Sequence, residues 1–163
     1  MKKMIFFMSI TIVLASLLIG CSSKNSIKGK PIKYKEIYSQ VIGFSEKDDT
    51  SKPIKQDAQL LMTNEAFHNF KDKYFTPRQI PIEEPAKDKA VLYLQIPSDT
   101  SAVNMYKVES LLATNNTLTV KLKNIGAAMV KATMDFDGTF KCVIFLEMDK
   151  TLLKENMVVQ VKK

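Results

Sequence analysis

The sequence has no Trp, one His, one Arg and two Cys among its 163 residues. A zinc site takes about four Cys and His ligands, so this composition excludes the usual zinc centres. The lone His68 has no Cys or Ser in a strained turn to accompany it, and a single His does not make a catalytic triad. The five Gly residues form no phosphate-binding loop. We therefore expect a protein that is not an enzyme and that holds no cofactor.

Lys carries almost all of the positive charge. The net charge is +7, and Arg78 is the sole Arg. Bidentate recognition of phosphate or carboxylate groups favours Arg, so such recognition is not the expected main function. The Lys residues are spread along the chain, and we expect no nucleic acid partner. Diffuse Lys favours solubility and some attraction to anionic surfaces.

The acidic residues give one weak metal signal. Asp135 and Asp137 in DFDG have the spacing of the first two ligands of a calcium loop, but Phe140 stands where such a loop needs Gly. Asp-Gly is also common in hairpin turns for backbone reasons. Glu83 and Glu84 lie in a Pro-rich stretch and are typical of solvated charge. We expect no metal site and no catalytic carboxylate pair.

The N-terminus has the layout of an export signal. A short basic start is followed by an apolar stretch over residues 4–19, then by Gly20 and Cys21. The letters LIGC at positions 18–21 resemble the lipobox of bacterial lipoproteins, in which the Cys sulfur receives a diacylglyceryl group and the preceding peptide is cut away. We predict that residues 1–20 are a lipoprotein signal peptide and that Cys21 is the lipid attachment site. The alternatives are an ordinary signal peptide with a chance Cys and a transmembrane anchor, which usually needs about 20 apolar residues.

Lipidation would hold the protein on the extracytoplasmic face of the bacterial cell membrane. Two acyl chains anchor a protein stably, at about 0.8 kcal/mol per buried CH₂. The stretch SSKNSIKGKPIK that follows Cys21 is polar and Lys-rich, with too little apolar content to fold alone. We predict a flexible tether over residues 21–33 and a single domain over residues 34–163, a size of about 130 residues that suits one core.

The first half of this domain contains two candidate strands and a long link. Residues 34–44, YKEIYSQVIGF, are rich in β-branched and aromatic residues and predict a strand. Residues 58–62 form a second, shorter apolar run. Residues 76–89, TPRQIPIEEPAKDK, carry Pro at four-residue spacing, which excludes a helix interior and a central strand. We expect this stretch to be an extended connection.

A helix is predicted between the second strand and the link. Thr63 or Asn64 stands where a helix N-cap would stand. Phe67, Phe70 and Tyr74 follow at i, i+3 and i+7, which places them on one face of a helix. These three aromatic residues are candidates for a pocket or an interface between the helix and a sheet.

The second half is rich in strands. Candidate strands occupy residues 90–96, 105–112, 117–123, 127–134, 139–148 and 157–161. The first is apolar on both parities, as expected of a central strand. Turn signals at 113–116 and 135–138 predict two hairpins, and residues 149–156 have room for one helical turn. The fold class is therefore α+β, with a mainly antiparallel sheet built of hairpins, as a sandwich or a partly open barrel, and one covering helix.

Cys142 is the second cysteine of the chain. It lies in KCVIFLEM and shares strand parity with Ile144, Leu146 and Met148. A buried, unreactive thiol fits this apolar pattern better than a nucleophile does. With Cys21 acylated, Cys142 has no partner for an intrachain disulfide.

The order of elements is similar to that of the PrcB family, lipoproteins named for a subunit that associates with and stabilises a secreted protease. The matching stretches are AQLLMTNEAFHNFKDKYF and the tail from AVLYLQIPSD through MYKVESLLATNNTLTVKLKN to NMVVQVKK. Together they cover roughly residues 58–163. Where the family carries a Gly-Gly-Tyr-like element, this chain has SAVNMYKV and keeps only Tyr106. The resemblance implies a non-enzymatic module that docks onto another exported protein, with Tyr106 as a candidate for its surface.

Three functions fit these observations. The leading one is a lipid-anchored, non-catalytic module that binds or stabilises an exported protein, whose identity the sequence does not give. A sheet edge or the extended link at residues 76–89 would be its docking surface, because extended segments and unpaired edges readily add strands. The second is a small-ligand carrier with a pocket lined by Phe67, Phe70 and Tyr74. The third is a spacer that coats the membrane surface.

The lipid anchor has a direct test. We expect the intact mass of the protein from its native membrane fraction to show diacylation at Cys21, and the Cys21→Ser variant to lose that mass and to leave the membrane fraction. An unmodified, soluble protein in both cases would contradict the assignment of residues 1–20 and of Cys21.

Overall fold

The computed structural model describes residues 29–43, 54–76, 79–97, 104–127 and 140–163. The strands are β1 (Lys30–Pro31), β2 (Tyr34–Ile42), β3 (Asp57–Leu61), β4 (Lys89–Pro97), β5 (Asn104–Ala113), β6 (Thr117–Ala127), β7 (Lys141–Asp149) and β8 (Val158–Lys162), joined by the helix α2 (Asn64–Tyr74) and the 3₁₀ turn η1 (Lys150–Leu152). This is an α+β fold, as the sequence predicts.

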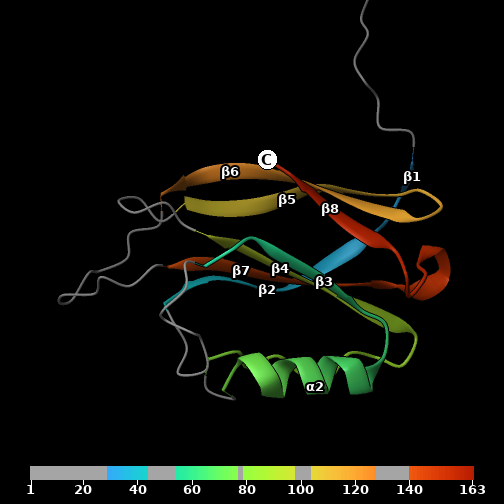
Figure 1. Ribbon diagram of the computed structural model, residues 1–163, viewed down its shortest axis with the longest axis horizontal. Coiled ribbons are helices and arrows are strands. Elements are labelled where there is room, and N and C mark those ends of the chain that lie inside the picture. The colour runs from blue at the N-terminus through green and yellow to red at the C-terminus, as the bar shows by residue number, and fades with distance from the viewer. Residues whose placement is uncertain (1–28, 44–53, 77–78, 98–103, 128–139) are drawn as a thin grey trace, which may run out of the picture.

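The elements form three layers (Figure 1). The outer sheet has the strand order β1-β5-β6-β8, and the middle sheet has the order β2-β7-β4-β3. The helix α2 covers the face of the middle sheet that points away from the outer sheet. Both sheets are open, so the arrangement is sandwich-like and the alternative of a partly open barrel does not apply.

The middle sheet is buried on both faces. In β4 the side chains of Ala90, Leu92, Leu94 and Ile96 belong to the core between the sheets. Val91 and Tyr93, which alternate with them, belong to the core beneath α2. The strand β7 repeats this division and is buried from Lys141 to Leu146. This explains why residues 90–96 are apolar on both parities.

The helix begins where the sequence predicts. Thr63 is the N-cap, and its Oγ1 accepts a hydrogen bond from Ala66 N at 3.0 Å. The helix ends at Tyr74, after which the Phe75 N–H donates to Lys71 O at 2.9 Å. Phe67 and Phe70 are its buried residues, because they lie on the face that meets the middle sheet.

The link after α2 is extended, as predicted, but it is fixed to the domain. Ile80 and Ile82 are buried in the core beneath the helix. Lys71 Nζ donates to Ile82 O at 2.7 Å, and the Tyr38 hydroxyl donates to Gln79 O at 3.1 Å. These contacts hold one side of the link against α2 and the middle sheet.

The pairing of the last strands differs in part from the sequence prediction. The hairpin over 105–112 and 117–123 is confirmed as β5 and β6. The second predicted hairpin is wrong for β7, because one edge of β7 pairs with β2 and the other with β4. Residues 128–138, the other arm and turn of that hairpin, lie outside the described residues. The strand β8 pairs with β6 in parallel rather than antiparallel.

The sheet pairing starts earlier than residue 34. Lys30 and Pro31 pair with Ala113 and Leu112 of β5, and Ile32 is buried. This end of the segment assigned to the tether therefore belongs to the outer sheet. The reason is local, since Ile32 contributes an apolar side chain and its N–H donates to Leu111 O at 3.0 Å.

The N-cap of α2 gives a stability prediction. Thr63→Ala removes the acceptor for the Ala66 N–H, so we expect the free energy of unfolding to fall by about 1 kcal/mol. Thr63→Ser keeps the hydroxyl and should retain most of the stability. Urea unfolding followed by circular dichroism measures both, and equal values for wild type and Thr63→Ala would contradict the role of the cap.

Candidate functional site

Cys21, the predicted lipid attachment site, lies outside the described residues. Among the described residues no helix is long and apolar enough to cross a membrane. Within the same part of the chain no group of three or more His, Cys, Asp or Glu residues could hold a metal ion.

The aromatic face of α2 is part of a packed core. The Phe70 ring centroid lies 4.6 Å from that of Tyr93, and the Tyr93 centroid lies 5.1 Å from that of Phe145. Phe67 also packs against Phe145, at 6.4 Å and nearly edge-on. Such ring contacts add about 0.5–1.5 kcal/mol beyond the buried area. Phe67 and Phe70 therefore fill the space between helix and sheet, which favours a structural role over the lining of a pocket.

Tyr74 lies at the border of this core. Its ring centroid is 4.8 Å from that of Phe70, and Lys73 Nζ lies 5.0 Å from the Tyr74 centroid. The side chain is partly buried, so part of it reaches the surface of the helix layer. Of the three predicted aromatic residues, Tyr74 is the one that is not fully buried.

Tyr106 belongs to the other core. It lies on β5, is almost fully buried between the two sheets, and has Lys163 Nζ at 5.4 Å from its ring centroid. The middle sheet separates it from α2 (Figure 1). The structure therefore brings Phe67, Phe70 and Tyr74 together, but it does not bring Tyr106 to them.

Cys142 is buried, as the sequence predicts, and His68 lies near the surface of α2. The His68 side chain is about half exposed, with Nε2 at 3.5 Å from Glu84 Oε1. Cys142 is fully buried, and this burial raises the pKa of its thiol. Neither residue has the surroundings of a catalytic base or an activated nucleophile.

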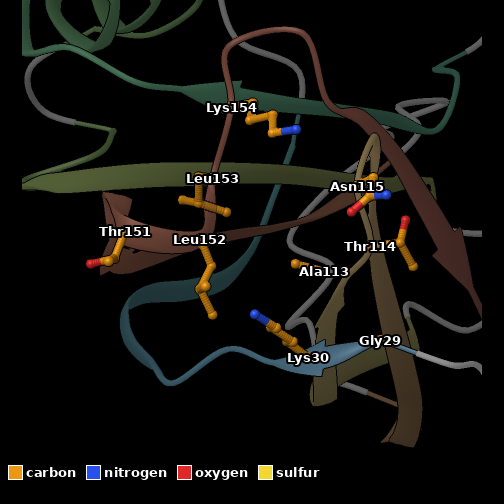
Figure 2. Close-up of a pocket in the computed structure, with 9 residues that line it drawn as sticks. All are labelled: Gly29, Lys30, Ala113, Thr114, Asn115, Thr151, Leu152, Leu153 and Lys154. Carbon is orange, nitrogen blue, oxygen red and sulfur yellow. The ribbon is translucent and has the colours of Figure 1, made fainter.

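A pocket of about 610 Å³ opens at one end of the sandwich. Three short segments line it: residues 29–30 at the start of β1, residues 113–115 at the β5–β6 turn, and residues 151–154 around η1 (Figure 2). Hydrogen bonds fix the walls, because Thr114 N donates to Thr117 O at 2.8 Å and Leu153 N donates to Lys150 O at 2.9 Å. We call this feature the end pocket.

The end pocket is cationic and has no acidic lining residue. Lys30 and Lys154 contribute ammonium groups, whereas the Thr114 hydroxyl already donates to Thr117 O at 3.2 Å. Asp149, the acid that precedes η1, forms an ion pair with Lys89. This set of donors suits an anionic ligand.

Three of the four sheet edges carry features that hinder strand addition. The β2 edge has a bulge between Glu36 and Tyr38. In β3, Asp57 Oδ1 accepts the Ala58 N–H at 2.8 Å. The β5 edge is partly covered by β1, and the Tyr34 hydroxyl donates to Val108 O at 2.7 Å. Bulges, short strands and covering groups of this kind protect edges from pairing with other chains.

The β8 edge is also short, at five residues, but among the described residues it has no bulge, no side chain bonded to its outward main chain and no covering strand paired with it. Val158 N donates to Asn116 O at 2.9 Å, so the main chain of Val158 faces β6. Because main-chain groups alternate along a strand, those of Val159 and Val161 point away from β6. The side chains of Val159 and Val161 pack against the core between the sheets, which holds the strand in place.

Sequence reasoning did not find the end pocket or the β8 edge. The pocket is assembled from segments far apart in the chain, and none of them carries a motif. The strand itself was predicted from MVVQV, but a strand pattern does not say which of its edges is paired.

The burial of Cys142 predicts its reactivity. In the Cys21→Ser variant Cys142 is the only thiol. We expect no reaction with a thiol reagent at pH 8 while the protein is folded, because the side chain is shielded and burial raises its pKa. One equivalent should react in denaturant. Rapid labelling of the native protein would contradict the described packing.

No protein-family model matches the chain, and no curated protein and no solved structure gives a significant match. The resemblance to the PrcB family therefore stays a prediction from the matching stretches of residues 58–163. The residues of the chain and their geometry carry the functional inference.

Proposed function

We propose that the protein is a membrane-anchored extracytoplasmic lipoprotein that acts as a non-catalytic module, binding or stabilising another exported protein. The anchor is Cys21, and the binding surface is the edge of β8. The observation that carries the binding role is the main chain of Val159 and Val161, which points away from β6 and pairs with no other described strand, although β3 lies close to β8.

Strand addition is the binding mode that suits this edge. An extended segment of a partner would donate to and accept from the main chain of β8, and its side chains would determine specificity. Val158 is 61% exposed and Gln160 is also exposed, so the solvent face of β8 offers apolar and polar contacts. Lys162 at the end of the strand would favour a partner segment with an acidic residue.

The extended link at residues 76–89 is the less suitable docking surface. Asn64 Nδ2 donates to Glu84 Oε1 at 2.5 Å and to Pro85 O at 3.2 Å. With Lys71 bound to Ile82 O, much of the link already has hydrogen-bond partners on the helix. A partner strand would have to displace these contacts.

The resemblance to the PrcB family supports a partner of a particular kind. That family is named for a subunit that associates with and stabilises a secreted protease, so an exported protease complex is the first partner to examine. The alternative of a small-ligand carrier with a pocket between helix and sheet gains little from the aromatic core, where the rings of Phe70, Tyr93 and Phe145 are in contact.

The role of β8 has a test with a matched control. Val161→Pro and Val161→Ala both lose packing against the core, but only Val161→Pro also removes the N–H that points away from β6. We expect Val161→Pro to weaken capture of a crosslinked partner in the native membrane fraction by about fivefold, the equivalent of one net hydrogen bond. Val161→Ala should capture nearly as much as wild type.

Thermal unfolding of both variants serves as the folding control. Equal capture by the two variants would contradict strand addition at β8. The absence of any crosslinked partner for the wild-type, Cys21-acylated protein would contradict the binding role as a whole.

A further inference from the structure

The end pocket lies next to the membrane anchor along the chain. Gly29 lines the pocket, and seven residues separate it from Cys21. A chain spans at most about 3.6 Å per residue, so the pocket stays within roughly 30 Å of Cys21 whatever the conformation of those residues. An acylated Cys21 would therefore keep the pocket close to the lipid headgroups.

The point of entry of the chain is fixed to the outer sheet. A Cβ atom on Gly29 would lie 3.1 Å from Ala113 O and 3.2 Å from Leu112 Cβ, so the backbone of residue 29 packs closely on β5. The pairing of Lys30 and Pro31 with β5 follows directly. The anchor would therefore hold the end of the domain that carries the pocket, with only residues 22–28 between Cys21 and Gly29.

The chemistry of the pocket fits an anionic headgroup. Lys30 and Lys154 line it from two different segments, and neither ammonium group forms an ion pair with a described acidic residue. Figure 2 shows Lys30 and Leu152 extending into the same region from β1 and from η1.

Exposed apolar side chains flank this end. Leu152 is 41% exposed and lines the pocket, and Val158 is 61% exposed and donates its N–H to Asn116 O in the β5–β6 turn. The third large exposed apolar residue, Ile125, lies on β6 beyond Lys123, away from the β5–β6 turn. An apolar group beside cationic groups is typical of protein surfaces that lie at a membrane interface.

We propose that the end pocket binds the phosphate headgroup of an anionic phospholipid and so holds this end of the domain against the membrane. The inference rests on the proposed anchoring at Cys21. The pocket would add a fixed orientation to that anchoring. Lys30, Lys154 and Leu152 would face the lipid, and α2 would lie away from the membrane. The length of β8 then remains open to a partner at the side of the domain.

The first test uses the chain from residue 21 with Cys21→Ser, which retains every described contact because both cores lie within residues 29–163. Sedimentation with vesicles measures binding without the anchor. The vesicles are made of phosphatidylcholine, with and without about 30 mol% phosphatidylglycerol, which gives them an anionic surface. We expect binding only where phosphatidylglycerol is present, and weaker binding at higher salt.

Two pairs of substitutions separate the pocket from diffuse charge. Lys30→Gln with Lys154→Gln should weaken binding about thirtyfold, at roughly fivefold for each Lys near an anionic surface. Lys107→Gln with Lys123→Gln is the matched control, because this cross-strand pair on the outer sheet is exposed and lies away from the turn. We expect the control pair to weaken vesicle binding by less than about threefold, which is below the roughly fivefold loss expected for one Lys near an anionic surface. Equal losses for both pairs, or binding of inorganic phosphate without binding of vesicles, would overturn the proposal.

A second test reads orientation in the anchored protein. The chain has no Trp, so Leu152→Trp introduces a single fluorophore at the pocket and Ile125→Trp introduces one at the other end of β6. In vesicles that contain brominated phosphatidylglycerol we expect quenching for Leu152→Trp and none for Ile125→Trp. Equal quenching of the two in protein whose mass shows diacylation would overturn the orientation while leaving the anchor intact. Loss of the diacyl mass itself would instead remove the proposed anchor.

Discussion

Burial of the middle sheet on both faces is the constraint on which the other features depend. The strands β4 and β7 carry apolar side chains on both parities, so one face must be covered by the outer sheet and the other by α2. At about 25 cal/mol per Å² of buried apolar surface, this double burial is the main source of stability. Phe67 and Phe70 of the helix are used for that purpose, which is why they lie in a filled core.

The surfaces left for function lie at the margins of this core. The outer sheet covers one face of the middle sheet. Its edge strand β8 is held by pairing with β6 and by packing of Val159 and Val161 against the core between the sheets. The end pocket forms where the start of β1, the β5–β6 turn and the η1 segment meet, at the border of the core between the sheets, to which Ala113 and Leu153 belong. A rigid interior with functional groups at an edge and an end is typical of binding modules, whose sites lie on a scaffold that does not need to change shape.

Local patterns in the sequence predicted much of the fold. The helix followed from the N-cap at Thr63 and the aromatic spacing, and the central position of residues 90–96 followed from apolar residues on both parities. The partners of β7 and the direction of β8 did not follow, because a strand pattern gives the period of its side chains but not the strand beside it. Of the candidate site residues, the sequence placed Phe67, Phe70 and Tyr74 on one face correctly. It could not tell whether that face would meet a sheet or a ligand, and it gave no sign that Tyr106 would be buried in a different core.

The insertion of β7 between β2 and β4 also governs when the chain can fold. The two neighbours come early in the sequence, and the strand that joins them comes more than forty residues after β4 ends at Pro97. A chain that has emerged only as far as β6 lacks the central strand of its middle sheet, and β2 and β4 have no common partner. Non-local pairing of this kind is slow to form and favours folding after the whole domain is present. If residues 1–20 direct export as proposed, late completion of the sheet would help to keep the chain unfolded while it crosses the membrane.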